Sequence, residues 1–257
     1  MEKLKKGYDR LTTFETSTKG YEWFGKSPGH EALSAYGIAQ FNDMNKVTNF
    51  VSKADLNRNV DWLMDRRNPN NSGQWELNKK AIDTFGRASQ DITDAYLVWV
   101  MTQEGRFTFE DLKNEFTNLK KISEKNEDPY FLALYSGALF NAGKKDEAKS
   151  ISRKYVSKQN ESTGAVEGAE SSITNSRGQS LLLETTSLAL INWLNQDPSE
   201  FSAQIDLGVG YLLSSIKKGG RFGSTQSTVM TLKALVRYTQ IYAGIQGKGK
   251  FVAYLNG

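Results

Sequence analysis

The stretch that decides the fold is 219–242, GGRFGSTQSTVMTLKALVRYTQIY. Lys217 and Lys218 precede it, and cations favour the negative end of a helix dipole. The glycine at 219 suits a left-handed C-cap, so the preceding helix is expected to end there. Ser224 or Thr225 can accept the first amide hydrogens of a new helix. That helix has apolar residues around most of its circumference, which predicts burial on more than one side.

Along the rest of the chain, helices with one polar side alternate with helices that are apolar all round. The predicted helices are 2–12, 30–44, 54–66, 90–101, 108–121, 129–142, 145–156, 179–194, 199–216 and 225–242. Residues 157–178 are polar and glycine-rich, which is typical of a surface loop. Strict alternation indicates an apolar inner ring inside an amphipathic outer ring. The sequence therefore predicts an all-α fold, an α/α toroid of the terpenoid cyclase/prenyltransferase kind. About five helical pairs leave that ring incomplete, and the missing pair is expected before Met1.

Composition excludes several classes of site. The chain has no Cys and one His among 257 residues, which removes thiol nucleophiles, disulfides and two-histidine metal sites. The net charge is +4, with acidic and basic residues interspersed, so no nucleic-acid partner is expected. No apolar run reaches membrane-spanning length, and the first residues, MEKLKKGYDR, do not form a signal peptide. We expect no cofactor and no metal.

Several stretches together resemble one family. The run GGRFGSTQSTVMTLKAL at 219–235 looks like the closing motif of the thioester-containing domain of α2-macroglobulin and complement proteins. Three further segments agree in order and spacing: YEWFG at Tyr21–Gly25, ETTSLAL at 184–190 and DITDAYLVWVM at 91–101. The segment GHEALSAYG, ending at Gly37, resembles an inner helix of microbial or protist-like members. The resemblance covers nearly the whole chain.

The resemblance implies an α/α toroid and a role as a scaffold in a protease trap or a surface-tagging defence protein, extracellular or periplasmic. The family's internal thioester joins a Cys and a Gln, and this chain has no Cys. We therefore expect a fragment that begins downstream of the thioester motif, that is not an enzyme, and that acts on proteases or surfaces through its parent protein. Residues 1–247 would be the toroid without its first helical pair. Residues 248–257 would be a strand leading to a flanking β-domain.

Family members differ at a position that tunes thioester reactivity, which is His in some and Asn or Asp in others. The resemblance places it in the segment LNKKAIDTFG at 77–86, at Asn78, or at Lys80 if the lengths differ. An Asn cannot act as a base near neutral pH as a His can, so a preference for amines over hydroxyls is expected. The structural alternative is a polar loop residue that makes local turn bonds.

Three further residues are candidates for the cavity or for structure. His30 either acts as a base beside Glu31 or starts a helix with its ring bonded to the backbone. Glu184 lies in a strongly apolar helix, so its carboxylate must cap loop amides or pair with a basic residue such as Arg177 or Arg221, or serve as a catalytic acid. Gln226 lies in the GSTQ run.

Two other functions stay open. One is an enzyme on the same toroid, a glycosidase, lyase or prenyl-type cyclase, with carboxylates and tryptophans around a deep central pocket. The five tryptophans are expected in the core instead; they are Trp23, Trp62, Trp75, Trp99 and Trp193. The other is a repeat-type interaction module, suggested by the tetratricopeptide-like run at 133–151.

Overall fold

The computed structural model describes residues 1–77, 88–216 and 222–243. The helices are α1 (Glu2–Thr12), α2 (Glu31–Asn45), α3 (Lys53–Asp65), α4 (Gln90–Thr102), α5 (Lys113–Ser123), α6 (Pro129–Asn141), α7 (Lys145–Lys154), α8 (Gly178–Gln196), α9 (Ser202–Ser214) and α10 (Thr225–Tyr242). Short 3-10 turns follow at Gln103–Gly105 and Val156–Lys158. Within the described ranges, β-structure is confined to isolated bridges, so the all-α prediction is confirmed.

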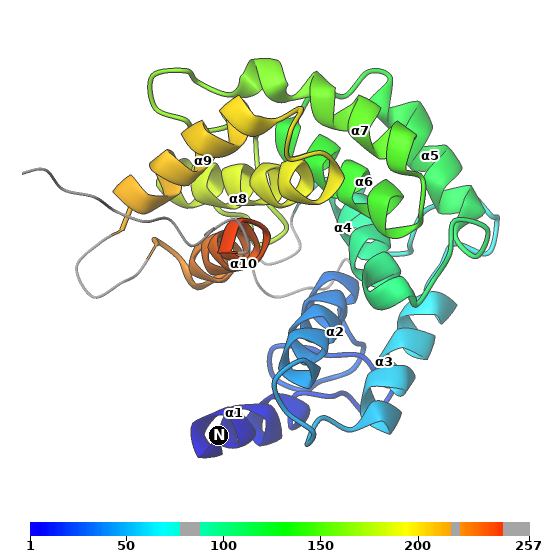
Figure 1. Ribbon diagram of the computed structural model, residues 1–257. Coiled ribbons are helices and arrows are strands. Elements are labelled where there is room, and N and C mark those ends of the chain that lie inside the picture. Colours follow the sequence, from blue (N-terminus) through cyan, green and yellow to red (C-terminus); the bar gives the residue numbers. More distant parts are fainter. Residues whose placement is uncertain (78–87, 217–221, 244–257) are drawn as a thin grey trace, which may run out of the picture.

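Every second helix belongs to an inner series, and the others lie outside it (Figure 1). Each inner helix packs on the next: α2 on α4, α4 on α6, α6 on α8 and α8 on α10. Nearly all of α6 is buried, whereas α7 buries only Ala148, Ile151 and Ser152. The helices that read as apolar all round are thus inside and the amphipathic ones outside, which confirms the α/α toroid.

Short-range side-chain bonds define where five of the described α-helices begin, namely α2, α3, α4, α6 and α10. Asp128 caps α6, since its Oδ1 accepts hydrogen bonds from the amides of Tyr130 at 2.7 Å and Phe131 at 3.2 Å, and Pro129 occupies the first turn. Ser89 caps α4 in the same way. Ser224, one of the two caps considered for α10, accepts from the amide of Ser227 at 3.1 Å. These starts follow from adjacent residues alone.

Two predicted helices begin later than expected. The pattern placed one at 199–216, but α9 begins at Ser202, and it placed the other at 108–121, but α5 begins at Lys113. Thr108 and Asp111 bond to each other instead: Thr108 Oγ1 donates to Asp111 Oδ2 at 2.7 Å, and the Asp111 amide donates to Thr108 Oγ1 at 3.3 Å. This side-chain to backbone closure holds a turn that competes with the helix.

The prediction that α10 is buried on more than one side is wrong. Met230, Thr231 and Ala234 are buried on the side facing α8. On the opposite side, Val229 is 38% exposed, Leu232 49% and Val236 54%; we call these three residues the α10 stripe. The reason is position, because α10 ends the inner series and its far side has no inner helix packed along it within the described residues. An ion pair between Lys233 Nζ and Asp43 Oδ2, at 2.6 Å, joins α10 to α2.

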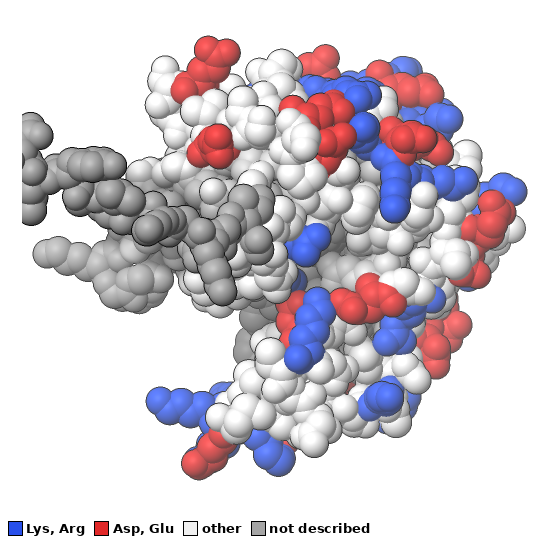
Figure 2. Space-filling model, viewed as in Figure 1, with Lys and Arg blue, Asp and Glu red and all other residues white. Residues whose placement is uncertain are grey.

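Charged side chains of both signs are mixed over the outer helices, as Figure 2 shows for the face that carries α5 and α7. Ion pairs such as Arg153 with Glu200, at 2.6 Å, and Lys149 with Asp197, at 3.1 Å, join α7 to the turn before α9. The face in this view therefore has interspersed charges, as the sequence indicated, and exposed pairs of this kind contribute little to stability.

Candidate functional site

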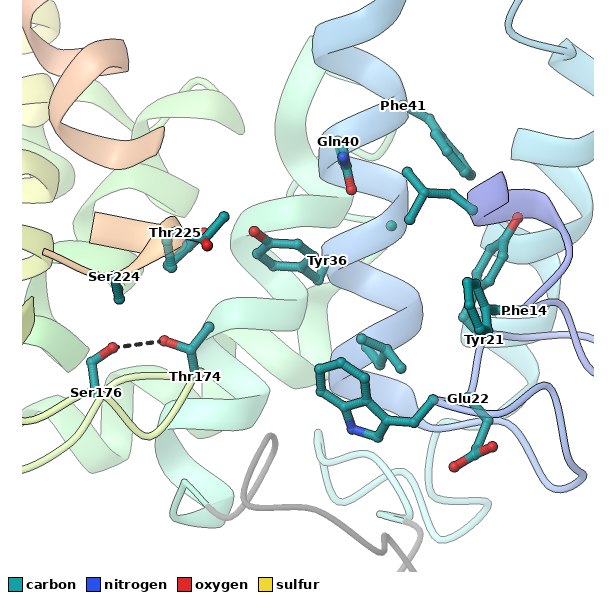
Figure 3. A pocket seen from close by; sticks show the side chains of 15 residues that line it. Phe14, Tyr21, Glu22, Tyr36, Gln40, Phe41, Thr174, Ser176, Ser224 and Thr225 are labelled. Carbon is teal, nitrogen blue, oxygen red and sulfur yellow. Dashed lines mark hydrogen bonds between the residues drawn. The ribbon is translucent and has the colours of Figure 1, made fainter. Parts of the chain in front are cut away.

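A cavity of about 550 Å³ lies between α2 and the first turn of α10. Aromatic residues dominate one side of it: Phe14, Tyr21, Trp23, Tyr36 and Phe41. Hydroxyl groups form the other side: Thr174, Ser176, Ser224 and Thr225. Figure 3 shows the two sides facing each other, with the ring of Tyr36 directed from α2 toward Thr225. The cavity therefore has one apolar, aromatic side and one hydroxyl-rich side.

The loop before α2 places the aromatic side by backbone hydrogen bonds and one close approach. The Tyr21 amide donates to Ser34 Oγ at 2.8 Å, and the His30 amide donates to the Tyr21 carbonyl at 2.8 Å. Gly20 has φ +73°, and a Cβ there would lie 2.8 Å from the Trp62 ring, so only glycine fits. The loop is thereby fixed against both α2 and α3.

Glu22 is the carboxylate that lines the cavity, and one of its two oxygens is engaged by the backbone. Oε2 accepts hydrogen bonds from the amides of Phe24 at 2.8 Å and Lys26 at 3.2 Å. Glu22 is 8% exposed. Its carboxylate therefore stabilises the turn and contributes negative charge to the cavity edge.

Glu184 in α8 is fully buried directly behind the hydroxyl side. Ser176 Oγ donates to its Oε1 at 2.5 Å, and Thr174 Oγ1 lies 3.4 Å from its Oε2. Burial raises the pKa of Glu184, and hydrogen bonds from Ser176, Ser172, Thr174 and Ser224 oppose that rise. Its partners are hydroxyls rather than the expected loop amides or Arg177, while Arg221 lies outside the described residues.

His30 has the structural role that the sequence offered as one alternative. It is the N-cap of α2, with Nδ1 accepting from the Leu33 amide at 3.3 Å. Its neighbour Glu31 is bonded elsewhere, because Arg66 Nε donates to Glu31 Oε1 at 2.9 Å. Burial lowers the pKa of His30 below its ordinary value of 6.5, while the charges of Glu31 and Glu22 partly offset this.

This depressed pKa makes a testable prediction. The unfolded chain binds a proton at His30 more readily than the folded chain, so stability is lost as pH falls below about 6.5. Asparagine also caps helices well but does not titrate. His30→Asn is therefore expected to remain within about 1 kcal/mol of wild type at pH 8 and to show a smaller loss on acidification. Urea unfolding at both pH values measures this; equal acid losses in the two proteins would contradict it.

Gln226 is 7% exposed and belongs to the cavity wall at the start of α10. Its Oε1 is buried, and it has no hydrogen-bond partner among the residues that the structure describes. The prediction that Gln226 belongs to the cavity is thus consistent with the structure, although no chemical role follows from its position.

Asn78 and its alternative Lys80 lie outside the described residues, as do Lys217, Lys218, Gly219 and the predicted strand at 248–257. The segment just before Asn78 is anchored to α4 by Asp94, whose Oδ1 accepts from the Trp75 amide at 3.1 Å and from Gln90 Nε2 at 3.0 Å. Burial raises the pKa of Asp94 to about 7, against these two hydrogen bonds. The reactivity-tuning role of Asn78 stays a prediction.

The tryptophans are mainly core residues, as expected. Trp75, Trp99 and Trp193 are buried, and Trp75 Nε1 donates to the Leu63 carbonyl at 2.8 Å. Trp62 is partly buried against the core, and Trp23 lines the cavity.

The described ranges contain no group of three or more His, Asp or Glu side chains arranged to hold a metal ion. Their helices lack the combined length and apolar character needed to cross a bilayer.

Sequence reasoning missed the hydroxyl side of the cavity. It treated 157–178 as a surface loop, but Val166, Ser172 and Ile173 are completely buried. The error came from reading polar residues as solvated, when the run SSITNS at 171–176 supplies hydroxyls to Glu184. The signal available in the sequence was a glutamate in a strongly apolar helix, a few residues downstream of a serine- and threonine-rich run.

Comparison with known proteins agrees with this architecture. The family model described as the A-macroglobulin TED domain matches residues 1–238. A relative is "Complement C3" of Lethenteron camtschaticum, 23% identical over 256 residues, which covers 91% of this chain and 15% of the lamprey protein. The chain therefore corresponds to a small part of that relative's length. Because the family model covers nearly the whole chain, this protein belongs to the A-macroglobulin TED domain family.

Proposed function

We propose that this domain is a target-capture module of an α-macroglobulin- or complement-like defence protein, and that it is not itself an enzyme. The family match supports the first part. The observation that carries the second part is the state of the carboxylates at the cavity: Glu22 is bound to two amides and Glu184 is fully buried behind hydroxyls.

The alternative is a toroid enzyme, and in its glycosidase form it needs two carboxylates that reach a substrate. It also needs an open pocket along the ring. The rings of Tyr96 on α4 and Tyr130 on α6 are fully buried, and the Ile173 amide donates to the Tyr130 hydroxyl at 3.3 Å. This packing counts against a deep catalytic pocket, and no observation favours the repeat-type interaction module.

The capture chemistry would come from the rest of the parent protein. This chain has no Cys, so a thioester of the family type cannot form within it. We propose that the domain extends over residues 1–247, that 248–257 connect it to a flanking β-domain, and that the parent protein works in the extracellular space or the periplasm. Its targets would be proteases or particle surfaces.

The α10 stripe supports a further helical pair in the parent protein. Val229, Leu232 and Val236 are spaced three and four residues apart, which gives one apolar helix face. Interior helices such as α4 and α6 have inner neighbours on both sides, whereas α10 packs on α8. We propose that another inner helix covers the stripe and completes the ring.

Replacing the stripe tests this arrangement. In the isolated chain, Val229→Ser, Leu232→Ser and Val236→Ser together are expected to change the free energy of unfolding by less than about 1.5 kcal/mol, because exposed substitutions have small effects. In the full-length protein the same triple variant should cost several-fold more, since it removes a buried face. Chemical unfolding of both forms measures the difference, and equal effects in the two would contradict the proposal.

The functional test uses the full-length parent protein and trypsin. A protease trap leaves trypsin active on a small ester substrate but blocks its action on casein. A surface tag instead becomes attached to particles after proteolysis, as measured by its retention after washing in detergent. The matched control is full-length protein carrying Trp193→Ala, which is expected to disrupt this domain. If the parent protein neither traps trypsin nor attaches to particles, the capture function fails.

A further inference from the structure

A smaller pocket lies where α2 ends and α3 begins, apart from the cavity described above. The two helices pack side by side (Figure 1), and residues of the 3-10 turn after α4 close a third side. The pocket has a volume of about 320 Å³, and seven of its eight lining residues are polar or charged. We call it the α2–α3 pocket.

Positive charge exceeds negative charge in the α2–α3 pocket. Lys46, Lys53 and Arg106 line it together with a single carboxylate, that of Glu104. Glu104 is already paired with Lys46, at 2.9 Å. Lys53 and Arg106 form no ion pair with any residue that the structure describes. Two cations are therefore left for an anionic ligand.

The guanidinium of Arg106 is held in place without being fully used. One of its nitrogens, Nη1, donates to Asn57 Oδ1 at 2.9 Å, which ties the 3-10 turn to α3. Its other N–H groups stay available, and the planar fork of a guanidinium matches two oxygens of a phosphate group. A lysine beside it adds a point charge, so Lys53 and Arg106 together are suited to phosphate.

Asn42 brings a buried and unsatisfied amide to the same pocket. It is only 6% exposed, and its side chain forms no hydrogen bond with any other described residue. Buried polar groups are normally paired, so this amide indicates a missing polar partner. Asn45 and Asn57 add two further side-chain amides to the lining. Amides both donate and accept hydrogen bonds, which matches the hydroxyl groups of a sugar.

Negative groups also lie near the pocket, and each is compensated. Asp43 Oδ2 is paired with Lys233 at 2.6 Å, and its Oδ1 lies 3.5 Å from Lys46 Nζ. Asp55, in the first turn of α3, is paired with Arg58 at 2.6 Å. The negative end of the α2 dipole meets the positive end of the α3 dipole here, so the two offset each other.

We propose that the α2–α3 pocket binds a sugar phosphate. Lys53 and Arg106 hold the phosphate oxygens, and Asn42 bonds to a sugar hydroxyl. Leu56, which is 3% exposed, is the apolar lining residue on which the C–H face of the ring packs. The volume is at the lower end of the range for small-molecule sites, which suits one monosaccharide ring with its phosphate. This site goes beyond the proposed function and does not depend on it.

The test titrates the 257-residue chain with glucose 6-phosphate, glucose 6-sulfate, inorganic phosphate and glucose. Two-dimensional amide NMR at low ionic strength and about pH 7.5 measures binding and locates it, since salt screens exposed charges and the phosphate monoester is then close to doubly charged. Glucose 6-phosphate is expected to bind about tenfold more tightly than the singly charged sulfate or inorganic phosphate, with shifts at Asn42 and Arg106. Glucose alone should not bind measurably.

Variants assign the binding to the residues named. Lys53→Gln and Arg106→Gln are each expected to weaken glucose 6-phosphate about tenfold. Glu104→Gln removes the carboxylate that competes for Lys46, so it should tighten binding several-fold, which a merely structural role would not do. Lys145→Gln removes one positive charge from an exposed position on α7; it is the matched control and should change nothing. Amide spectra without ligand verify that each variant is folded.

Four outcomes would overturn the proposal: no binding of glucose 6-phosphate, equal binding of glucose 6-sulfate, an equal loss of affinity in Lys145→Gln, or shifts confined to other parts of the chain. Each leaves the capture function untouched, because that function is tested on the full-length protein with trypsin and particles.

Discussion

Replacing Trp193 with alanine is expected to lower the free energy of unfolding by about 3–5 kcal/mol, the usual cost of emptying a large aromatic site in a core. Trp193 is fully buried in α8. Its ring centroid lies 5.7 Å from that of Tyr155, at the end of α7, and 6.1 Å from that of Phe201, just before α9. The indole therefore joins an inner helix to two outer ones, and the surrounding helices cannot collapse onto the space it leaves.

Urea unfolding followed by far-ultraviolet circular dichroism measures this effect. The control is Leu213→Ala on α9, where the side chain is 51% exposed, so the expected change is within about 0.5 kcal/mol. A Trp193→Ala protein as stable as the Leu213→Ala protein would show that the contact between the two rings of helices does not hold the fold together.

Gly164→Ala is expected to cost at least about 3 kcal/mol, from backbone strain plus a clash. Gly164 has φ +83°, a conformation that L-residues rarely adopt. A Cβ at this position would overlap the carbonyl oxygen of Leu207 and lie 2.8 Å from its carbonyl carbon. Both obstacles are backbone atoms of α9, so the loop must move away from the helix.

A second glycine separates strain from clash. Gly168 has φ +96°, but a Cβ there would meet nothing within 4 Å. Gly168→Ala should therefore cost only the strain, roughly 1–2 kcal/mol. Thermal and urea unfolding of the two variants give the difference. If both variants lose the same stability, then the close approach of the 157–178 segment to α9 does not constrain the fold.

These two substitutions also bear on the cavity through the segment that contains Gly164. Gln159 Nε2 bonds to the Gly164 carbonyl at 3.1 Å and to the Gln204 carbonyl at 3.0 Å, which ties the loop to α9. The same loop continues to Thr174 and Ser176. Displacing it at Gly164 is thus expected to disturb the hydroxyl side of the cavity, whereas Gly168→Ala leaves the contact with α9 intact.

The sequence by itself determined the all-helical fold and the alternation of its inner and outer helices. Both follow from interactions within a few residues: the apolar periodicity of each helix, and caps such as Ser89, Asp128 and Ser224 that bond to amides two or three positions away. The same local reasoning gave His30 as a helix start. It failed at Thr108, where two local patterns compete for the same backbone.

Only the tertiary structure decided the cavity, the burial of the 171–176 run and the exposure of the α10 stripe. The cavity joins residues from 11–41, 174–176 and 224–226, and no pattern within any one of these segments indicates that they meet. The hydroxyls around Glu184 were taken for solvated groups because a sequence shows that a residue is polar but not what lies against it. Likewise, Val229, Leu232 and Val236 read as buried because an apolar helix face implies a partner, and whether that partner is packed there depends on the arrangement of the whole ring.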